Sequence, residues 1–169
     1  GGMSFHGGLI GVILAIIYSS WTSKIPIIIF SDLISIVSPI GLFFGRLANF
    51  INGELFGRVT NHPFGMIFPN GGKLPRHPSQ LYEAFFEGLV LLFIMIFLMK
   101  KSNFFEKRGF LTASFLFFYG IFRFFIEYFR EPDGHIGLIY FNFSMGQILS
   151  FPMIISGLYF MTIFYNKNE

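Results

Sequence analysis

The sequence contains an uninterrupted apolar run, Leu89-Val90-Leu91-Leu92-Phe93-Ile94-Met95-Ile96-Phe97-Leu98-Met99. Mostly apolar residues extend it to about residues 78–99, close to the roughly 20 residues that a helix needs to cross the hydrocarbon core of a bilayer. Similar windows lie at about residues 7–22, 25–51, 110–129 and 143–165. The sequence therefore predicts an all-α, polytopic integral membrane helical bundle, a single domain with about five transmembrane helices.

The composition supports a chain embedded in lipid. Of 169 residues, 53% are hydrophobic, 12% are charged and 27 are Phe, and the mean hydropathy is +0.64. A soluble domain carries about 25% charged residues. The net charge of +3 is spread along the chain without a dense basic run, which argues against nucleic acid as a partner. Because the chain has no cysteine, a thiol that reacts here must come from a partner.

Two segments interrupt the simple pattern. The window at residues 25–51 carries two prolines and could be kinked, and its Asp32 is expected to act as a cap or helix contact. The connection at residues 52–77 holds five Gly and three Pro, which predicts a structured external loop between spans two and three. The chain opens Gly-Gly-Met-Ser-Phe-His-Gly-Gly and enters an apolar window at once, so we expect upstream helices to be missing.

The polar residues should gather on one side of the membrane, because consecutive spans alternate in direction. The opposite side receives Lys24, the cations between residues 100 and 108, and Lys167, and short loops rich in Lys and Arg stay in the cytoplasm. The site is therefore predicted on the extracytoplasmic side. Its candidate residues are His6, Arg46, Asn49, Glu54, His77, Gln80, Glu83, Tyr119, Arg123, Glu127 and Arg130.

The fourth span carries a polar stripe. Tyr119, Arg123, Glu127 and Arg130 recur at helical spacing, so they share one face of a helix that is otherwise apolar. An Arg near the bilayer centre costs roughly 2.5–3.5 kcal/mol, so this face should border protein or water. An ion pair between Arg123 and Glu127 would explain the stripe structurally. A shared anion site explains in addition why Arg46 arrives at the same depth.

A second stripe opens the third span. Gln80, Glu83 and Glu87 recur at i, i+3 and i+7 and point one polar face inward. Glu83 could neutralise Arg46 or Arg123 across the bundle, or it could take part in binding. The spacing alone leaves both interpretations open.

Four blocks of the sequence together resemble one family. GRLANFINGELFG at residues 45–57 resembles the signature of prolipoprotein diacylglyceryl transferases. SFHGGL (4–9), RHPSQLYEA (76–84) and YGIFRFFIEYFREPD (119–133) agree in the same order. The family's N-terminal membrane helices, with a functional tyrosine near the first, have no counterpart here, so we expect the lipid cavity to be incomplete in this chain.

This resemblance implies a transferase of the bacterial cytoplasmic (inner) membrane. Its substrates are phosphatidylglycerol and the lipobox cysteine of a prolipoprotein. Transfer of the diacylglyceryl group forms a thioether and releases glycerol phosphate. The resemblance implies no cofactor and no metal.

The residues suit such a reaction. Arg46 and Arg123 are candidate phosphate ligands, because guanidinium binds two oxygens at once and stays charged. His6 is the candidate base for the thiol, with a glutamate or spontaneous ionisation as alternatives. Asn49 and Glu54 would orient the guanidinium groups and the glycerol hydroxyls, and Tyr119 would donate a hydrogen bond. The remaining candidates for substrate binding are Gly57, His77, Gln80, Glu83, Glu127 and Arg130.

Two other functions remain possible from the residues. A transporter or channel for an anionic solute would line its pathway with the same arginines. The polar groups lie on one side, however, and the sequence shows no internal repeat, which disfavours alternating access. A membrane scaffold without catalytic activity would leave the convergence of His6, Arg46 and Arg123 unexplained.

Overall fold

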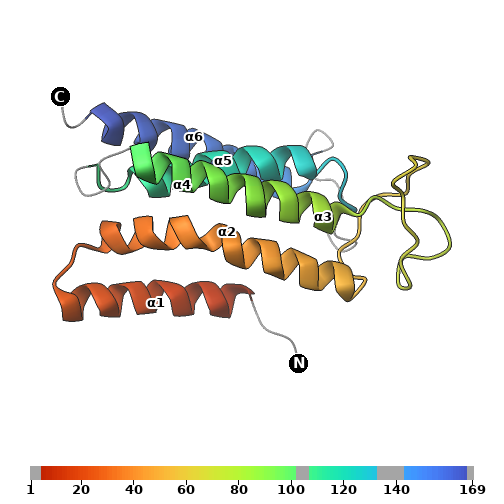
Figure 1. The fold of residues 1–169 in the computed structure, drawn as a ribbon, viewed down its shortest axis with the longest axis horizontal. Coiled ribbons are helices and arrows are strands. Elements are labelled where there is room, and N and C mark those ends of the chain that lie inside the picture. The colour runs from red at the N-terminus through yellow and green to blue at the C-terminus, as the bar shows by residue number, and fades with distance from the viewer. Residues whose placement is uncertain (1–4, 102–106, 133–142, 167–169) are drawn as a thin grey trace.

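The computed structural model describes residues 5–101, 107–132 and 143–166, with side chains from residue 7 to residue 165 within these ranges. The described part is helical and forms no strand, only isolated bridges. This confirms the predicted all-α fold. The elements are α1 (Phe5–Ser23), α2 (Ile27–Ile51), α3 (Ser79–Glu83), the π-helical η1 (Ala84–Val90), α4 (Leu91–Lys101), α5 (Phe110–Ile126) and α6 (Met145–Asn166) (Figure 1).

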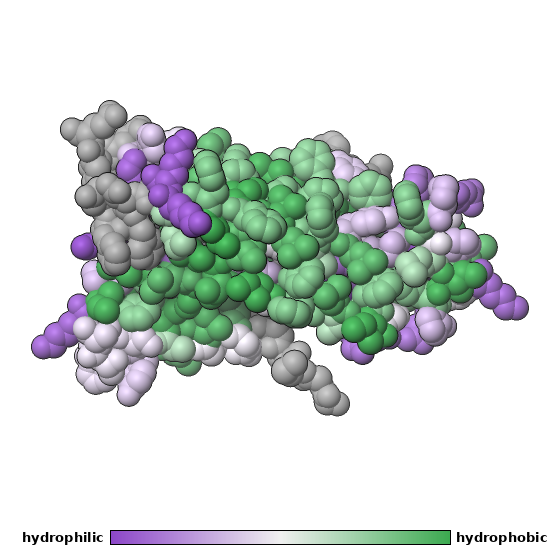
Figure 2. All heavy atoms as spheres, in the orientation of Figure 1, coloured by the Kyte–Doolittle hydropathy of each residue, from purple (hydrophilic) through white to green (hydrophobic). Residues whose placement is uncertain are grey.

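Three helical stretches in the described part are long and apolar enough to cross a membrane. They are Ile27–Ile51, Ser79–Lys101, in which α3, η1 and α4 follow one another without a break, and Met145–Tyr165. Gly7–Ser23 and Phe110–Ile126 are shorter apolar helices. Apolar side chains form a broad band across the molecule, with hydrophilic groups at both ends (Figure 2). The chain is therefore a polytopic membrane bundle, and a crossing by all five helices remains a prediction.

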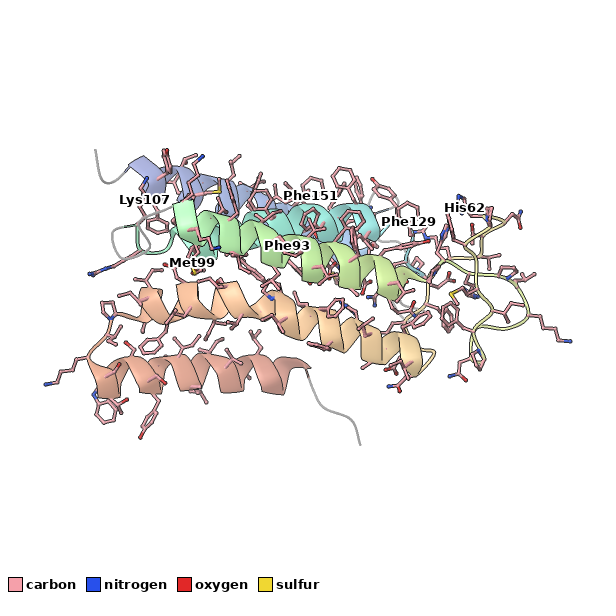
Figure 3. The ribbon with its side chains drawn as sticks, viewed as in Figure 1. His62, Phe93, Met99, Lys107, Phe129 and Phe151 are labelled. Carbon is pink, nitrogen blue, oxygen red and sulfur yellow. The ribbon has the colours of Figure 1, made fainter. Side chains whose placement is uncertain are left out.

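Successive helices run in opposite directions along the bundle (Figure 1). The end of α2, the start of α3 and the end of α5 lie together at one end, and the loop of residues 52–78 extends beyond it, whereas α1 begins beside the second half of α2, short of this end. We call this the loop end. His62 lies in that loop, whereas Lys107 lies at the opposite end of the bundle (Figure 3).

Asp32 connects α2 to the start of α5. Its fully buried carboxylate accepts hydrogen bonds from the N–H of Gly109 (2.6 Å), the N–H of Thr112 (2.7 Å) and the hydroxyl of Thr112 (2.7 Å). Free N–H groups and the helix dipole make a helix N-terminus favourable for a carboxylate. The expected capping role of Asp32 is thus confirmed. These hydrogen bonds fix the start of α5 against α2.

The core lies between α4 and α5. Leu91 and Met95 pack there against Phe110 and Leu111, and all four are buried. On its other side α5 approaches α6 closely at Gly157, where an added Cβ would lie 2.6 Å from the backbone nitrogen of Phe117. Small residues permit such close helix packing in membranes. These contacts fix the face of α5 that carries Arg123.

Candidate functional site

The centre of the site is Glu83, the last residue of α3. Its Oε2 lies 2.7 Å from Nε of Arg46 on α2, and its Oε1 lies 3.2 Å from Nη1 of Arg123 on α5. Oε1 also lies 3.3 Å from Nη1 of Arg130, in the turn after α5. Glu83 has no exposed surface. One buried carboxylate therefore holds guanidinium groups from three separate segments.

Two further carboxylates complete the group. Glu127 Oε2 lies 2.9 Å from Nη2 of Arg123, which is the predicted i, i+4 pair. Glu87, fully buried in η1, is more distant, at 3.7 Å from Nη1 of Arg123 and 3.9 Å from Nη2 of Arg46. Neither oxygen of Glu87 accepts a hydrogen bond from the described residues. We call these six residues, Arg46, Glu83, Glu87, Arg123, Glu127 and Arg130, the arginine–glutamate cluster.

The arginines of the cluster are more exposed than its glutamates. Glu83 and Glu87 are inaccessible, whereas the side chains of Arg46, Arg123 and Arg130 are 17%, 15% and 10% exposed. Three arginines and three glutamates balance in formal charge, as buried charges require. Glu83 and Glu87 are thus less exposed than the guanidinium groups, so the accessible part of the cluster is mainly cationic.

Gln80 and Ser79 connect the loop to the start of α3. Its Nε2 donates to the backbone carbonyl of Glu54 (2.6 Å), and the hydroxyl of Ser79 donates to the carbonyl of Leu55 (3.2 Å). Glu54 itself points outward, with its carboxylate 3.4 Å from Nδ2 of Asn52. The structure thus places Gln80 beside the backbone of Glu54, and the Glu54 carboxylate beside an asparagine rather than an arginine.

Gly57 joins the loop to the segment after α5. Its N–H donates to the carbonyl of His77 (2.8 Å), and its carbonyl accepts from Nη1 of Arg76 (3.2 Å). An added Cβ would collide with the carbonyl oxygen of Phe129 and lie 2.7 Å from that of His77. Only glycine fits this position, so its place in the motif has a structural cause.

His77 lies outside the membrane-spanning helices. Its ring packs edge-on against Phe129, at 5.2 Å between centroids, and its Nδ1 lies 3.4 Å from the hydroxyl of Tyr82. Burial lowers the pKa of His77 below the usual 6.5, and the positive charge of His62 lowers it further. The neutral imidazole is therefore the favoured form in the fold.

Three predicted residues form no ion pair with the cluster within the described part of the chain. Tyr119 stacks on Phe115, at 5.6 Å between centroids, and packs against the core, while its hydroxyl interacts electrostatically with Glu87, Arg123 and other residues of the cluster. Asn49 is half-buried near the end of α2, where its carbonyl accepts from the N–H of Glu54 (3.0 Å). His6 lies in the first turn of α1, and its side chain is outside the described residues.

The sequence interpretation missed the contribution of α6. The hydroxyl of Ser144 donates to Oε1 of Glu127 (3.0 Å). Ser144 and Gln147 form a Ser-x-x-Gln capping box immediately before an apolar helix, a pattern that could have been recognised. Within the described ranges, no group of three His, Asp or Glu could hold a metal ion.

The fold and the site together define a polytopic membrane protein with a buried arginine–glutamate cluster near one end of its apolar band. Residues 1–163 match the family model described as prolipoprotein diacylglyceryl transferase, and the chain belongs to this family. The resemblance seen in the four sequence blocks is thereby confirmed.

Three relatives illustrate the similarity, and each is named phosphatidylglycerol–prolipoprotein diacylglyceryl transferase. The protein of Rickettsia akari is 57% identical over 159 residues, which cover 94% of this chain and 61% of the relative. That of Pseudoalteromonas translucida is 55% identical over 158 residues (94% and 58%). That of Geobacter sulfurreducens is 54% identical over 158 residues (94% and 60%). The chain therefore spans 58–61% of the length of these relatives.

Proposed function

We propose that this chain forms the phosphate-binding part of a transferase that moves the diacylglyceryl group of phosphatidylglycerol to the lipobox cysteine of a bacterial prolipoprotein. Family membership and the names of the relatives support the reaction. The observation that carries the proposal for this site is the partial exposure of Arg46 and Arg123 beside the inaccessible carboxylates of Glu83 and Glu87. The names of the relatives give no support to an anion transporter.

The reaction is a substitution at carbon. The thiolate sulfur attacks the glycerol carbon that bears the phosphate ester, a C–S bond forms and the C–O bond breaks. The electron pair of that bond leaves with glycerol phosphate, and the thiol proton goes to a base. Phosphate changes from a diester with one negative charge to a monoester with two. Cations at the phosphate therefore stabilise the transition state more than the bound lipid.

Arg46 and Arg123 can bind the phosphate without dismantling the cluster. Their contacts to Glu83, at 2.7 Å and 3.2 Å, hold both side chains in place. Their contacts to Glu87, at 3.9 Å and 3.7 Å, are long and weak. On Arg46, Nη2 faces Glu87 and can turn to a phosphate oxygen while Nε remains at Glu83. On Arg123, Nη1 contacts both carboxylates and would exchange the longer contact, to Glu87, for a phosphate oxygen. Glu83 thus keeps the two guanidinium groups in position, and the phosphate replaces their longer contacts to Glu87.

His6 is the proposed base for the thiol. It belongs to the first turn of α1, which begins in the half of the bundle nearer the loop end, short of the end of α2 (Figure 1). An imidazole titrates near neutral pH, and the thiol reacts as thiolate. Glu83 is a weaker candidate, because its carboxylate already contacts three guanidinium groups.

We place the loop end on the extracytoplasmic side of the bacterial cytoplasmic membrane. Lys24, Lys107 and Arg108 lie in the connections at the other end of the bundle. Cations in short loops favour the cytoplasm. The lipobox thiol would then reach the site from the outer face of the membrane.

The test uses membranes that contain the complete protein, phosphatidylglycerol labelled in both the acyl chains and the headgroup glycerol, and a lipobox peptide. Acyl label should appear on the peptide in equal amount to the released glycerol phosphate, and a Cys→Ser peptide should accept none. Arg46→Ala should lower transfer about 100-fold or more. Lys73→Ala, which removes an exposed loop cation, is the matched control and should transfer normally. Equal activity of the two variants would refute the assigned role of Arg46.

A further inference from the structure

We propose that the N-terminal turn of α6 positions Arg123 for the phosphate by holding Glu127, so that Ser144 and Gly146 are positioning residues for the reaction. This inference rests on the proposed function, since it assigns a phosphate to Arg123. Ser144 and Gly146 contact the carboxylate of Glu127, and this carboxylate in turn pairs with Arg123.

Two contacts connect Ser144 to Arg123, and both are made by the carboxylate of Glu127. Oε1 of Glu127 accepts the hydroxyl proton of Ser144 (3.0 Å), and Oε2 lies 2.9 Å from Nη2 of Arg123. Both Glu127 and Ser144 are buried. Oε1 is thus hydrogen-bonded, and Oε2 is ion-paired without a hydrogen bond from the described residues. Because Glu127 holds Nη2, the other terminal nitrogen of Arg123 points towards Glu83 and Glu87.

The Ser144 hydroxyl is itself held in place. It accepts the N–H of Gln147 (3.2 Å), and Oε1 of Gln147 accepts the N–H of Ser144 (3.1 Å). This reciprocal capping box satisfies two N–H groups at the start of α6. It also leaves the hydroxyl proton of Ser144 free to point at Glu127, whose negative charge lies at the positive end of the α6 dipole.

Gly146 gives an independent indication that this turn is shaped around Glu127. A Cβ at this position would lie 2.7 Å from the carboxylate carbon of Glu127 and 2.8 Å from each of its oxygens. Glycine is less favourable than alanine in a helix. The requirement that Glu127 approach the turn closely explains a glycine that α6 alone would not favour.

Substitution of either residue should therefore misplace the Glu127 carboxylate and, through it, the guanidinium of Arg123. Ser144→Ala removes the donor and leaves Oε1 of a buried carboxylate unpaired. A hydrogen bond to a charged group contributes roughly 1.5–3 kcal/mol, which corresponds to about tenfold or more. Gly146→Ala should push the carboxylate away while raising the helix propensity of α6.

The experiment measures kcat and KM for phosphatidylglycerol with the complete protein. Ser144→Ala and Gly146→Ala should each lower kcat/KM about tenfold. Ser144→Thr keeps the hydroxyl and should restore most of the activity. The control is Ser114→Ala, because Ser114 is also buried but donates only within α5, to the carbonyl of Phe110 (2.7 Å). It should behave as wild type.

Thermal unfolding separates positioning from simple destabilisation. Gly146→Ala should lose activity without a lower Tm, which a purely structural role of the turn would not produce. Wild-type kcat/KM in Ser144→Ala and Gly146→Ala would overturn the inference and leave the proposed function intact. The same losses in Ser144→Thr and Ser114→Ala would also overturn it. Absence of transfer by the wild-type protein would refute the proposed function first, and this inference with it.

Discussion

Glu83→Gln removes one negative charge from the middle of the arginine–glutamate cluster and keeps the size of the side chain. Glu83 is fully buried and lies within 3.3 Å of three guanidinium groups. The substitution leaves three arginines facing two carboxylates, Glu87 and Glu127. Removing one partner of a buried ion pair costs about 3–5 kcal/mol, because the other charge stays buried without compensation. We therefore expect Glu83→Gln to be strongly destabilising.

Thermal unfolding of the purified complete protein in detergent measures this loss. For a chain of 150–250 residues, 1 kcal/mol corresponds to about 2–4 °C, so Tm should fall by roughly 6–20 °C. Variants are compared at one scan rate, because unfolding of such a protein is expected to be irreversible. Transfer activity should fall together with Tm, since Arg46 and Arg123 lose their common holder.

Glu131→Gln is the matched control. Glu131 is half exposed and pairs with Arg76 at 3.1 Å, outside the membrane-spanning helices. Exposed ion pairs contribute about 0–1 kcal/mol, so this variant should unfold within a few degrees of the wild type. Equal Tm shifts in Glu83→Gln and Glu131→Gln would refute the reasoning that the cluster is held together by a buried central carboxylate.

Three further predictions concern the base, the sidedness and the loop. His6→Ala should lower transfer by about 100-fold to 10,000-fold near neutral pH and recover in alkaline buffer, which ionises the thiol directly; a defect that is constant across pH would indicate a positioning role instead. Because the chain has no cysteine, single cysteines can replace the exposed Asn70 and Ser23. Asn70→Cys should react with a membrane-impermeant reagent in intact cells and Ser23→Cys should not, and equal labelling would contradict the proposed orientation. Burial lowers the pKa of His77, so the unfolded chain takes up the proton first, and the free energy of unfolding should decrease as pH falls below about 6.5; His77→Gln should flatten this dependence, and an unchanged slope would exclude His77 as its source.

Much of the fold could be predicted from the sequence, because a membrane-spanning helix must be long and apolar. The five predicted windows coincide with helical segments, and Asp32 makes the predicted capping contact. The gathering of polar residues at one end follows from alternation alone. The prolines of α2 suggested a possible kink, yet Ile27–Ile51 is assigned as one helix with Pro39 inside it.

The pairing within the site could not be predicted in the same way. The spacing of Gln80, Glu83 and Glu87 places them on one face but leaves open which of them meets an arginine. In the structure Glu83 pairs with three guanidinium groups, and Glu87 lies 3.7–3.9 Å from two of them. Gln80 instead donates a hydrogen bond to the backbone carbonyl of Glu54. Helix rotation and the π-helical turns of η1 decide this outcome, and neither has a simple local sequence signal. The Ser144 capping box, in contrast, has a recognisable sequence pattern and was overlooked.

We assign to Arg123 the binding of phosphate through its planar guanidinium group, in addition to its pairing with Glu83 and Glu127. The most direct test is kcat/KM for phosphatidylglycerol in the complete protein carrying Arg123→Lys or Arg123→Ala, at matched membrane abundance. Lysine keeps the charge but loses the fork that can hold two oxygens at once, so both variants should fall by about 100-fold or more. Retention of more than half of the wild-type kcat/KM by Arg123→Lys would contradict the account and favour a structural ion pair.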